Sequence, residues 1–332
     1  MHVDMKLLDA WSRVLVLCGV GAGSGVLLLK GAIAYEANVT TARLAAAQLG
    51  ARVMQVELDH YAASSGGALA GNRAAIAAMK EADLVVDMMG MDRGTEQFEI
   101  LAAGTRILLV KEPPATLVRL VPTVEDKARV LAATARLAAA RAMTIVSKHG
   151  TDLAVTLGEY PCLTQYGYAD EPGRWDHWPG AFVATWPNER SANGRVVLAP
   201  GDAILPFKQY VRSEVVLEIE AGYVRSIAGG FDARYLREYM AKFGDPEGYA
   251  VSHLGWGLCP RAHWTALGTT DRQETNGMES RAFAGNFMFS TGPNAEAGGS
   301  RHTPCHLDIP MQDCTVALDG EPVVVAGALV HG

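Results

Sequence analysis

The hydrophobic pattern of this 332-residue chain changes its period near residue 143. Before that point, short apolar runs alternate with alanine-rich segments of helical spacing, a pattern typical of α/β units around a mainly parallel sheet. The pattern predicts strands at 13–18, 52–58, 83–88 and 106–110, and helices at 38–50 and 124–142. Residues 1–142 are therefore expected to form a Rossmann-like α/β domain.

After residue 142 the apolar residues alternate with a period of two, and glycine turns recur. Hairpins are predicted around His149-Gly150, Ala221-Gly222 and Asp319-Gly320, each of which lies between two apolar runs. One helix is expected in this half, at 233–243, with Asp232 as its N-cap. Residues 143–332 are therefore predicted to form a second, β-rich domain.

Charge and composition narrow the class of protein. The formal net charge of -7 is not gathered in a long basic or acidic run, so binding to nucleic acid is not expected. The longest uncharged stretch, 14–29, is broken by glycines and is shorter than the ~20 apolar residues of a membrane helix. Asp4 and Asp9 precede it, which argues against a signal peptide. A cytoplasmic protein without a membrane partner is expected.

The glycine-rich run 19–25 follows a predicted strand, where a dinucleotide-binding fingerprint would lie. Its spacing fails, because Ser24 stands where the GxGxxG pattern needs its third glycine. A flexible loop is the favoured interpretation. The five cysteines form no CxxC pair, so neither a disulfide framework nor a cysteine zinc site is predicted.

The strongest chemical signal is His306-Leu307-Asp308 near the C-terminus. In an extended segment, side chains two apart project to the same face, so this imidazole and carboxylate can share one metal ion. The pair alone is also compatible with a hydrogen-bonded His–Asp pair at a strand end. His253 and Ser290, in uncharged glycine-containing surroundings, are candidate partners. Two histidines and one carboxylate suit Fe(II) with open positions, and zinc accepts the same donors.

Several motifs carry a family resemblance: FSTGPN at 289–294, TPCHLDIPMQDCTVALDG at 303–320, VSHLGWG at 251–257, GTDL at 150–153 and HWPGAF at 177–182. With these motifs the chain resembles the 2,5-dihydroxypyridine 5,6-dioxygenases, ring-cleaving enzymes of nicotinate degradation that are distant relatives of the aminopeptidase T metallopeptidases. The resemblance implies that His253, Ser290, His306 and Asp308 are the ligands of one Fe(II) ion.

The peptidase relatives place metal-binding glutamates in the segment that corresponds to 179–189. Here Thr185 and Trp186 stand where an acid would be expected, and Glu189 lies a few residues later. A two-metal hydrolase needs carboxylates to hold its ions, so this segment favours a single metal and the dioxygenase.

A second cluster, Trp175-Asp176-His177-Trp178, has a histidine flanked by two tryptophans. Such a cluster can form an apolar slot for a flat ring, with Trp175 and Trp178 as substrate-binding residues; the alternative is an ordinary core cluster at a domain edge. Because related enzymes approach the metal at this motif, we expect His177 to act as the acid/base residue. His302 is the second candidate for that role.

The resemblance therefore implies an Fe(II)-dependent, extradiol-like dioxygenase that uses O2 to convert 2,5-dihydroxypyridine to N-formylmaleamate. It also implies a homo-oligomer. The alternatives are a metallo-aminopeptidase with a metal-activated water and a catalytically silent protein that binds a small aromatic ligand.

Overall fold

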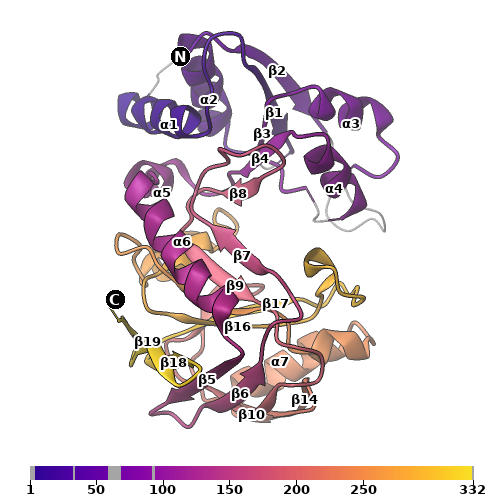
Figure 1. Ribbon diagram of the computed structural model, residues 1–332, viewed down its shortest axis with the longest axis vertical. Helices are drawn as coiled ribbons and strands as arrows, with labels where there is room; N and C mark the ends of the chain where they lie inside the picture. The colour runs from indigo at the N-terminus through magenta and orange to yellow at the C-terminus, as the bar shows by residue number, and fades with distance from the viewer. Residues whose placement is uncertain (1–3, 33, 59–68, 92–93, 331–332) are drawn as a thin grey trace. The chain divides into compact units, whose positions relative to one another are not determined.

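The structure is a computed structural model that describes residues 4–32, 34–58, 69–91 and 94–330 (Figure 1). The chain divides into two compact units. The first comprises Met1–Val124 and Gln165–Gly180, and the second comprises Glu125–Thr164 and Ala181–Gly332. The expected boundary at 142/143 differs from this division in two respects: residues 125–142 belong to the second unit, and residues 165–180 return to the first unit after the β-rich part has begun.

The first unit is built on a parallel sheet of five strands in the order β2-β1-β3-β4-β8. The strands are β1 (Gly25–Lys30), β2 (Arg52–Glu57), β3 (Leu84–Asp87), β4 (Arg106–Leu109) and β8 (Trp175–His177). Figure 1 shows helices α1 (Met5–Leu17) and α2 (Glu36–Gln48) on one side of this sheet, and α3 (Arg73–Lys80) and α4 (Thr95–Ala102) on the other. A short helix, α5 (Pro114–Arg119), follows β4. The strands expected at 52–58, 83–88 and 106–110 and the helix at 38–50 are confirmed.

The strand expected at 13–18 is wrong, because this apolar run is the end of helix α1. Residues further upstream extend its apolar pattern with helical spacing, and Leu7, Trp11 and Val14 are all buried. Asp4 caps the helix by accepting hydrogen bonds from the backbone N–H groups of Lys6 and Leu7. The glycine-rich run consequently precedes the first strand, β1, and does not follow one.

Strand β8 adds to the free edge of β4, with His177 level with Leu109. The segment around β8 folds back on itself so tightly that a Cβ atom at Gly180 would lie 2.3 Å from the backbone nitrogen of Gly167. Gly167 itself has a φ of +98°, a conformation that L side chains rarely adopt. Glycine is therefore needed at both positions to bring this segment into the first unit.

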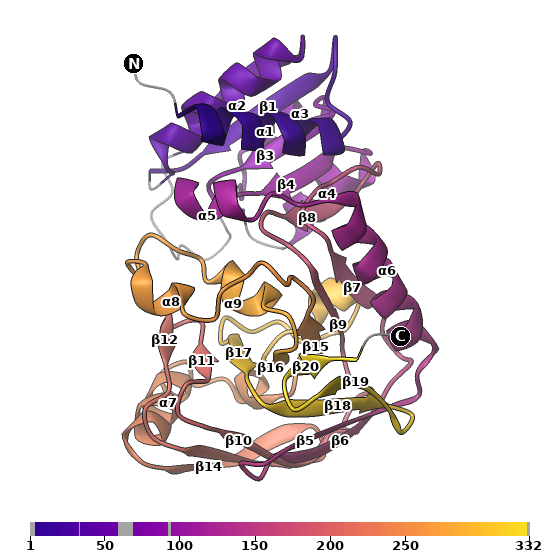
Figure 2. The ribbon, with the colours of Figure 1, turned by 90° about the vertical axis from the view of Figure 1, so that its left-hand side faces the viewer.

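The second unit contains an eight-stranded sheet and a five-stranded sheet. Figures 1 and 2 show the five-stranded, smaller sheet against one face of the eight-stranded, larger sheet. The larger sheet has the order β14-β13-β10-β6-β5-β18-β19-β20, and the smaller one β17-β16-β15-β9-β7. Strands β16 and β18 make contact between them. The larger sheet contains β5 (Ala142–Ser147), β6 (Asp152–Thr156), β10 (Asn193–Leu198), β13 (Val215–Glu220), β14 (Tyr223–Gly229), β18 (Cys314–Leu318), β19 (Glu321–Val325) and β20 (Ala328–Leu329).

The smaller sheet contains β7 (Cys162–Gln165), β9 (Phe182–Thr185), β15 (Leu254–Gly257), β16 (Phe287–Thr291) and β17 (Leu307–Met311). A separate ribbon pairs β11 (Ala203–Ile204) with β12 (Gln209–Tyr210). The three expected hairpins are confirmed as the antiparallel pairs β5–β6, β13–β14 and β18–β19.

The helices of the second unit differ from expectation in three ways. Helix α6 (Val124–Ala139) ends three residues before the predicted terminus at 142. Helix α7 (Phe231–Ala241) has Gly230 at its N-cap, because Asp232 instead accepts hydrogen bonds from the backbone N–H groups of Arg212 and Ser213. Two short helices, α8 (Ala266–Thr269) and α9 (Met278–Ala282), were not expected. Among the described residues, no helix has the length and apolar character needed to cross a membrane.

Candidate metal centre

Three neighbouring strands of the smaller sheet bring the predicted ligands together. His253 lies directly before β15, Ser290 is in β16, and Asp308 is in β17, preceded by His306. The antiparallel register places Ser290 directly opposite Asp308. The sheet therefore brings together residues that are up to 55 positions apart in the sequence, counting from His253 to Asp308.

The two imidazoles converge on one oxygen of Asp308. The Nε2 atom of His253 lies 3.2 Å from Asp308 Oδ1, and the Nε2 atom of His306 lies 3.5 Å from the same oxygen. One ligand atom from each residue lies within 4.8 Å of the other two. His253 and Asp308 are buried, whereas the His306 side chain is half-buried. The predicted same-face projection of His306 and Asp308 is confirmed.

The hydrogen bonds around these atoms fit a metal ion. Asp308 Oδ1 is buried, and its neighbours are the two imidazole Nε2 atoms, neither of which donates a well-aligned hydrogen bond to it; a carboxylate oxygen in this position is stabilised when a cation binds it. Nδ1 of His306 lies 2.8 Å from the carbonyl oxygen of Thr291, so it carries the proton and leaves the Nε2 lone pair free. The resulting set of two nitrogens and one oxygen is suited to a divalent transition metal.

The charges of the cluster are strongly coupled. Burial alone would raise the pKa of Asp308, but Arg281 and the two histidines hold that pKa well below its usual value. Burial would lower the pKa of His306, but the carboxylate of Asp308 raises it above its ordinary value. Asp308 is therefore ionised at neutral pH.

Ser290 is fully buried beside the cluster. Its hydroxyl donates a hydrogen bond of 2.6 Å to the carbonyl oxygen of His253. The proton of Ser290 thereby links β16 to the segment that presents His253. Its oxygen retains lone pairs, which makes it at most a weak, neutral ligand.

Aromatic residues form a wall on one side of His253. The ring of Trp186 meets it edge-on at a centroid distance of 5.6 Å, and Phe182 lies at 6.4 Å. Trp186 is one of the residues that occupy the expected position of the peptidase acids, and it is buried. The wall is consequently apolar where a second ion would need a carboxylate.

Glu189 lies a few residues after the position where the peptidases have a metal-binding acid, and its side chain forms an ion pair with Arg301. Arg301 Nη1 donates to both carboxylate oxygens of Glu189 at 2.7 and 2.6 Å. The same guanidinium donates to the carbonyl oxygens of Val251 and Gly292, which lie two residues from His253 and from Ser290 respectively. Arg301 therefore fastens together the two segments that carry these ligands.

His177 lies in the first unit, at the end of β8, and is buried. Its Nδ1 is 2.5 Å from the carbonyl oxygen of Pro179, and its Nε2 is 2.9 Å from Oε1 of Gln165. Since a carbonyl oxygen can only accept, the bond to Pro179 places a proton on Nδ1. This proton fixes the orientation of the ring.

The two tryptophans beside His177 have different environments. Trp178 is 1 % exposed, meets Trp11 edge-on at 5.0 Å and donates its indole N–H to the carbonyl oxygen of Leu120. Its ring packs in the core of the first unit. Trp175 is partly exposed and meets His177 edge-on at 5.7 Å. Ring binding by Trp175 and Trp178 stays a prediction.

His302, the second acid/base candidate, is exposed in the segment that precedes β17. The structure also reveals a residue that the sequence reasoning missed. Arg281 in α9 forms an ion pair with Oδ2 of Asp308. It lies in the sequence ESRAF, where no spacing or motif distinguishes it from a surface arginine.

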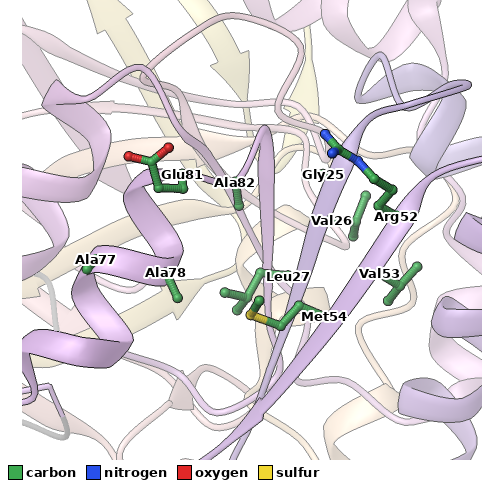
Figure 3. Close-up of a pocket in the computed structure, with 10 residues that line it drawn as sticks. All are labelled: Gly25, Val26, Leu27, Arg52, Val53, Met54, Ala77, Ala78, Glu81 and Ala82. Carbon is green, nitrogen blue, oxygen red and sulfur yellow. The ribbon is translucent and has the colours of Figure 1, made fainter.

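A separate groove of about 590 Å³ lies in the first unit, between β1, β2 and α3 (Figure 3). Its walls are mainly apolar, and Arg52 and Glu81 are its charged lining residues, seen on opposite sides in Figure 3. It contains none of the predicted site residues.

Comparison with known proteins gives a consistent result. The family model described as 2,5-dihydroxypyridine 5,6-dioxygenase matches residues 6–331. The chain is 51% identical over 338 residues to the 2,5-dihydroxypyridine 5,6-dioxygenase of Pseudomonas putida KT2440, with 98% of this chain and 97% of that protein covered.

Solved structures of two proteins illustrate the similarity of the fold. A structure of the 2,5-dihydroxypyridine dioxygenase from Pseudomonas putida KT2440 matches with a TM-score of 0.95 and 51% identity, covering 98% of this chain and 97% of that one. Wild-type AmpT from Thermus thermophilus matches with a TM-score of 0.62 and 16% identity, covering 98% and 99% respectively. At that identity, the second likeness extends to the fold alone.

Proposed function

This chain belongs to the 2,5-dihydroxypyridine 5,6-dioxygenase family, and on that premise we propose that it cleaves the ring of 2,5-dihydroxypyridine between C5 and C6. Both atoms of O2 enter the product, N-formylmaleamate. The observation that supports this proposal best is the cluster of His253, His306 and Asp308, in which both Nε2 atoms converge on the buried Oδ1 of Asp308.

We propose that the metal is Fe(II), held by His253, His306 and Asp308, with Ser290 as a weaker oxygen donor. When bound, Fe(II) supplies the one-electron chemistry that O2 needs to react with an aromatic ring. The protein's own contribution is to present three ligand atoms from one side. The apolar wall of Phe182 and Trp186 excludes water from the side of His253.

We also propose that His177 accepts the proton of a ring hydroxyl. The bond from Nδ1 to Pro179 keeps a proton on Nδ1, so Nε2 is the nitrogen that would accept the substrate proton. Oε1 of Gln165 lies 2.9 Å from Nε2 and can only accept, so Nε2 becomes a base once it has lost its proton or the Gln165 amide has turned its NH2 group toward the ring. The residues thus supply an oriented base, which typically contributes about a hundredfold or more to the rate.

The aminopeptidase alternative is less well supported. The cluster found among the described residues contains a single carboxylate, Asp308, and Arg281 occupies its second oxygen. A second hydrolytic ion would therefore lack anionic donors, and no carboxylate of the cluster is free to activate a water molecule.

The test is oxygen uptake by the protein loaded anaerobically with Fe(II) and then mixed with 2,5-dihydroxypyridine. We expect one O2 consumed per ring and a product 32 mass units heavier than the substrate. The Asp308→Asn variant, prepared in the same way, serves as the inactive control. Hydrolysis of leucyl amides without oxygen uptake would instead support the peptidase.

A further inference from the structure

The two oxygens of Asp308 have different neighbours. Oδ1 lacks a hydrogen-bond partner and faces the Nε2 atoms of His253 and His306, whereas Oδ2 accepts a bond from Nη2 of Arg281. Asp308 is 2 % exposed, and the Arg281 side chain is 24 % exposed. The ion pair is thus largely removed from water, where a charge-assisted bond orients its partner strongly.

The backbone of α9, which carries Arg281, is held against β15 by a buried side chain and a close backbone approach. The side chain of Asn286, which is buried, donates to the carbonyl oxygens of Ser280 and Arg281 at 2.5 and 2.9 Å and accepts from the backbone N–H of Gly257 at 2.7 Å. A Cβ atom at Gly257 would lie 2.2 Å from the carbonyl oxygen of Phe283, so only glycine allows α9 to lie this close to β15. Arg281 is therefore fixed relative to the strand that follows His253.

We propose that Arg281 is a positioning residue that selects the metal-binding atom of Asp308. By occupying Oδ2, it fixes the carboxylate so that Oδ1 alone points at the two imidazoles. A carboxylate that binds through one oxygen leaves more coordination positions for the substrate and O2. The inference rests on the proposed function, because it requires the cluster to bind a metal.

Two simpler roles compete with this one. Arg281 could only anchor α9 to β17, or it could act only through its charge. An anchor would affect the stability of the metal-free protein without affecting metal binding. A purely electrostatic cation would repel a divalent ion, so its removal would tighten metal binding.

The experiment compares Arg281→Met and Arg281→Lys with the control Arg261→Met. Arg261 forms an ion pair at 2.5 Å with another buried aspartate of the same unit, Asp126, which also pairs with Arg129. The dissociation constants of Fe(II) and Co(II) are measured anaerobically for each variant, together with the visible spectrum of bound Co(II) and the melting temperature of the metal-free protein.

We expect Arg281→Met to bind Fe(II) roughly 10–100-fold more weakly than wild type, the usual effect of losing a residue that orients a ligand. The visible spectrum of Co(II) bound to Arg281→Met should differ from that of wild type. Arg281→Lys should recover most of the metal affinity. Arg261→Met should match wild type in both metal affinity and Co(II) spectrum. Unchanged or tighter metal binding by Arg281→Met would overturn the inference while leaving the proposed function intact. If wild type itself binds neither ion, both fail.

Discussion

At the scale of single residues, His306 and His302 are four positions apart, and we expect their replacement to have opposite effects on metal binding. His306 shares Asp308 Oδ1 with His253, whereas His302 is exposed in the preceding segment. We expect His306→Ala to lose about 100-fold or more in Fe(II) affinity, since removing a ligand costs at least as much as removing its support. His302→Ala should retain the metal. Elemental analysis after washing with a chelator measures both, and a metal-free His302 variant would contradict this assignment.

Ser290 combines a possible ligand atom with a definite structural bond. Replacing it by alanine removes the donor to the buried carbonyl oxygen of His253. We expect Ser290→Ala to lose about 1–3 kcal/mol of stability in urea denaturation, because that carbonyl is left unsatisfied. It should keep most of its iron, because a neutral hydroxyl is a weak ligand. Complete loss of iron by a folded Ser290→Ala protein would show that the hydroxyl is an essential ligand.

The base role proposed for His177 predicts a specific kinetic change. His177→Ala should keep its iron, lose roughly a hundredfold or more in turnover, and lose the acidic limb of its pH–rate profile. The limb should disappear because a base works only in its unprotonated form. Gln165→Ala, which removes only the partner of Nε2, should retain the limb. Normal turnover with an unchanged limb in His177→Ala would leave the residue a structural role in β8.

At the scale of secondary-structure elements, Arg301 joins the entry to β15 with the exit from β16. We expect Arg301→Met to destabilise the protein by about 2 kcal/mol, because two backbone carbonyls and Glu189 lose a nearly buried charged donor. The matched control is Arg195→Met, which breaks the exposed pair with Glu218. Its effect should be about 0.5 kcal/mol or less. If denaturant titrations show that both variants lose the same free energy of unfolding, Arg301 does not stabilise the site.

The elements that the sequence predicted well are those whose signals are local. Hairpins such as β18–β19 were located by a two-residue turn between alternating runs, and the HxD pair by its spacing alone. The strand assigned to 13–18 failed because a short apolar run fits a strand or a buried helix, and Leu7 and Trp11 upstream decide between them. Arg281 could not be predicted, because its role depends on α9 lying against β15, and that contact is tertiary.

At the scale of the whole molecule, the proposed ligands belong entirely to the second unit. Metal binding should therefore protect the backbone amides of β15, β16 and β17 from hydrogen exchange and leave the sheet of the first unit nearly unchanged. At a free metal concentration of 100 times Kd, the stabilisation should be about 2.7 kcal/mol. Mass spectrometry of exchanged peptides, with and without metal, measures this. Protection confined to the first unit would contradict the assigned site.

The division of the chain was less predictable than its elements. A single boundary at 142/143 follows naturally from the change in hydrophobic period, but residues 125–142 belong to the second unit and residues 165–180 to the first. Strand β8 has only three residues, Trp175–His177, and nothing in so short a segment indicates which sheet it joins. Its partner β4 ends at Leu109, and no local rule connects two segments so far apart in the sequence.

The late position of β8 in the chain also has a consequence for biosynthesis. A nascent chain exposes the edge of β4 from the moment Leu109 leaves the ribosome until Trp175 follows, and β5 and β6 are made in between. An uncovered edge strand is a site for pairing with other chains. Ribosomes stalled when residues up to a point between 110 and 175 have left the exit tunnel should therefore yield more aggregated product than ribosomes stalled when Gly180 has also left it, because the parallel sheet can then close its edge.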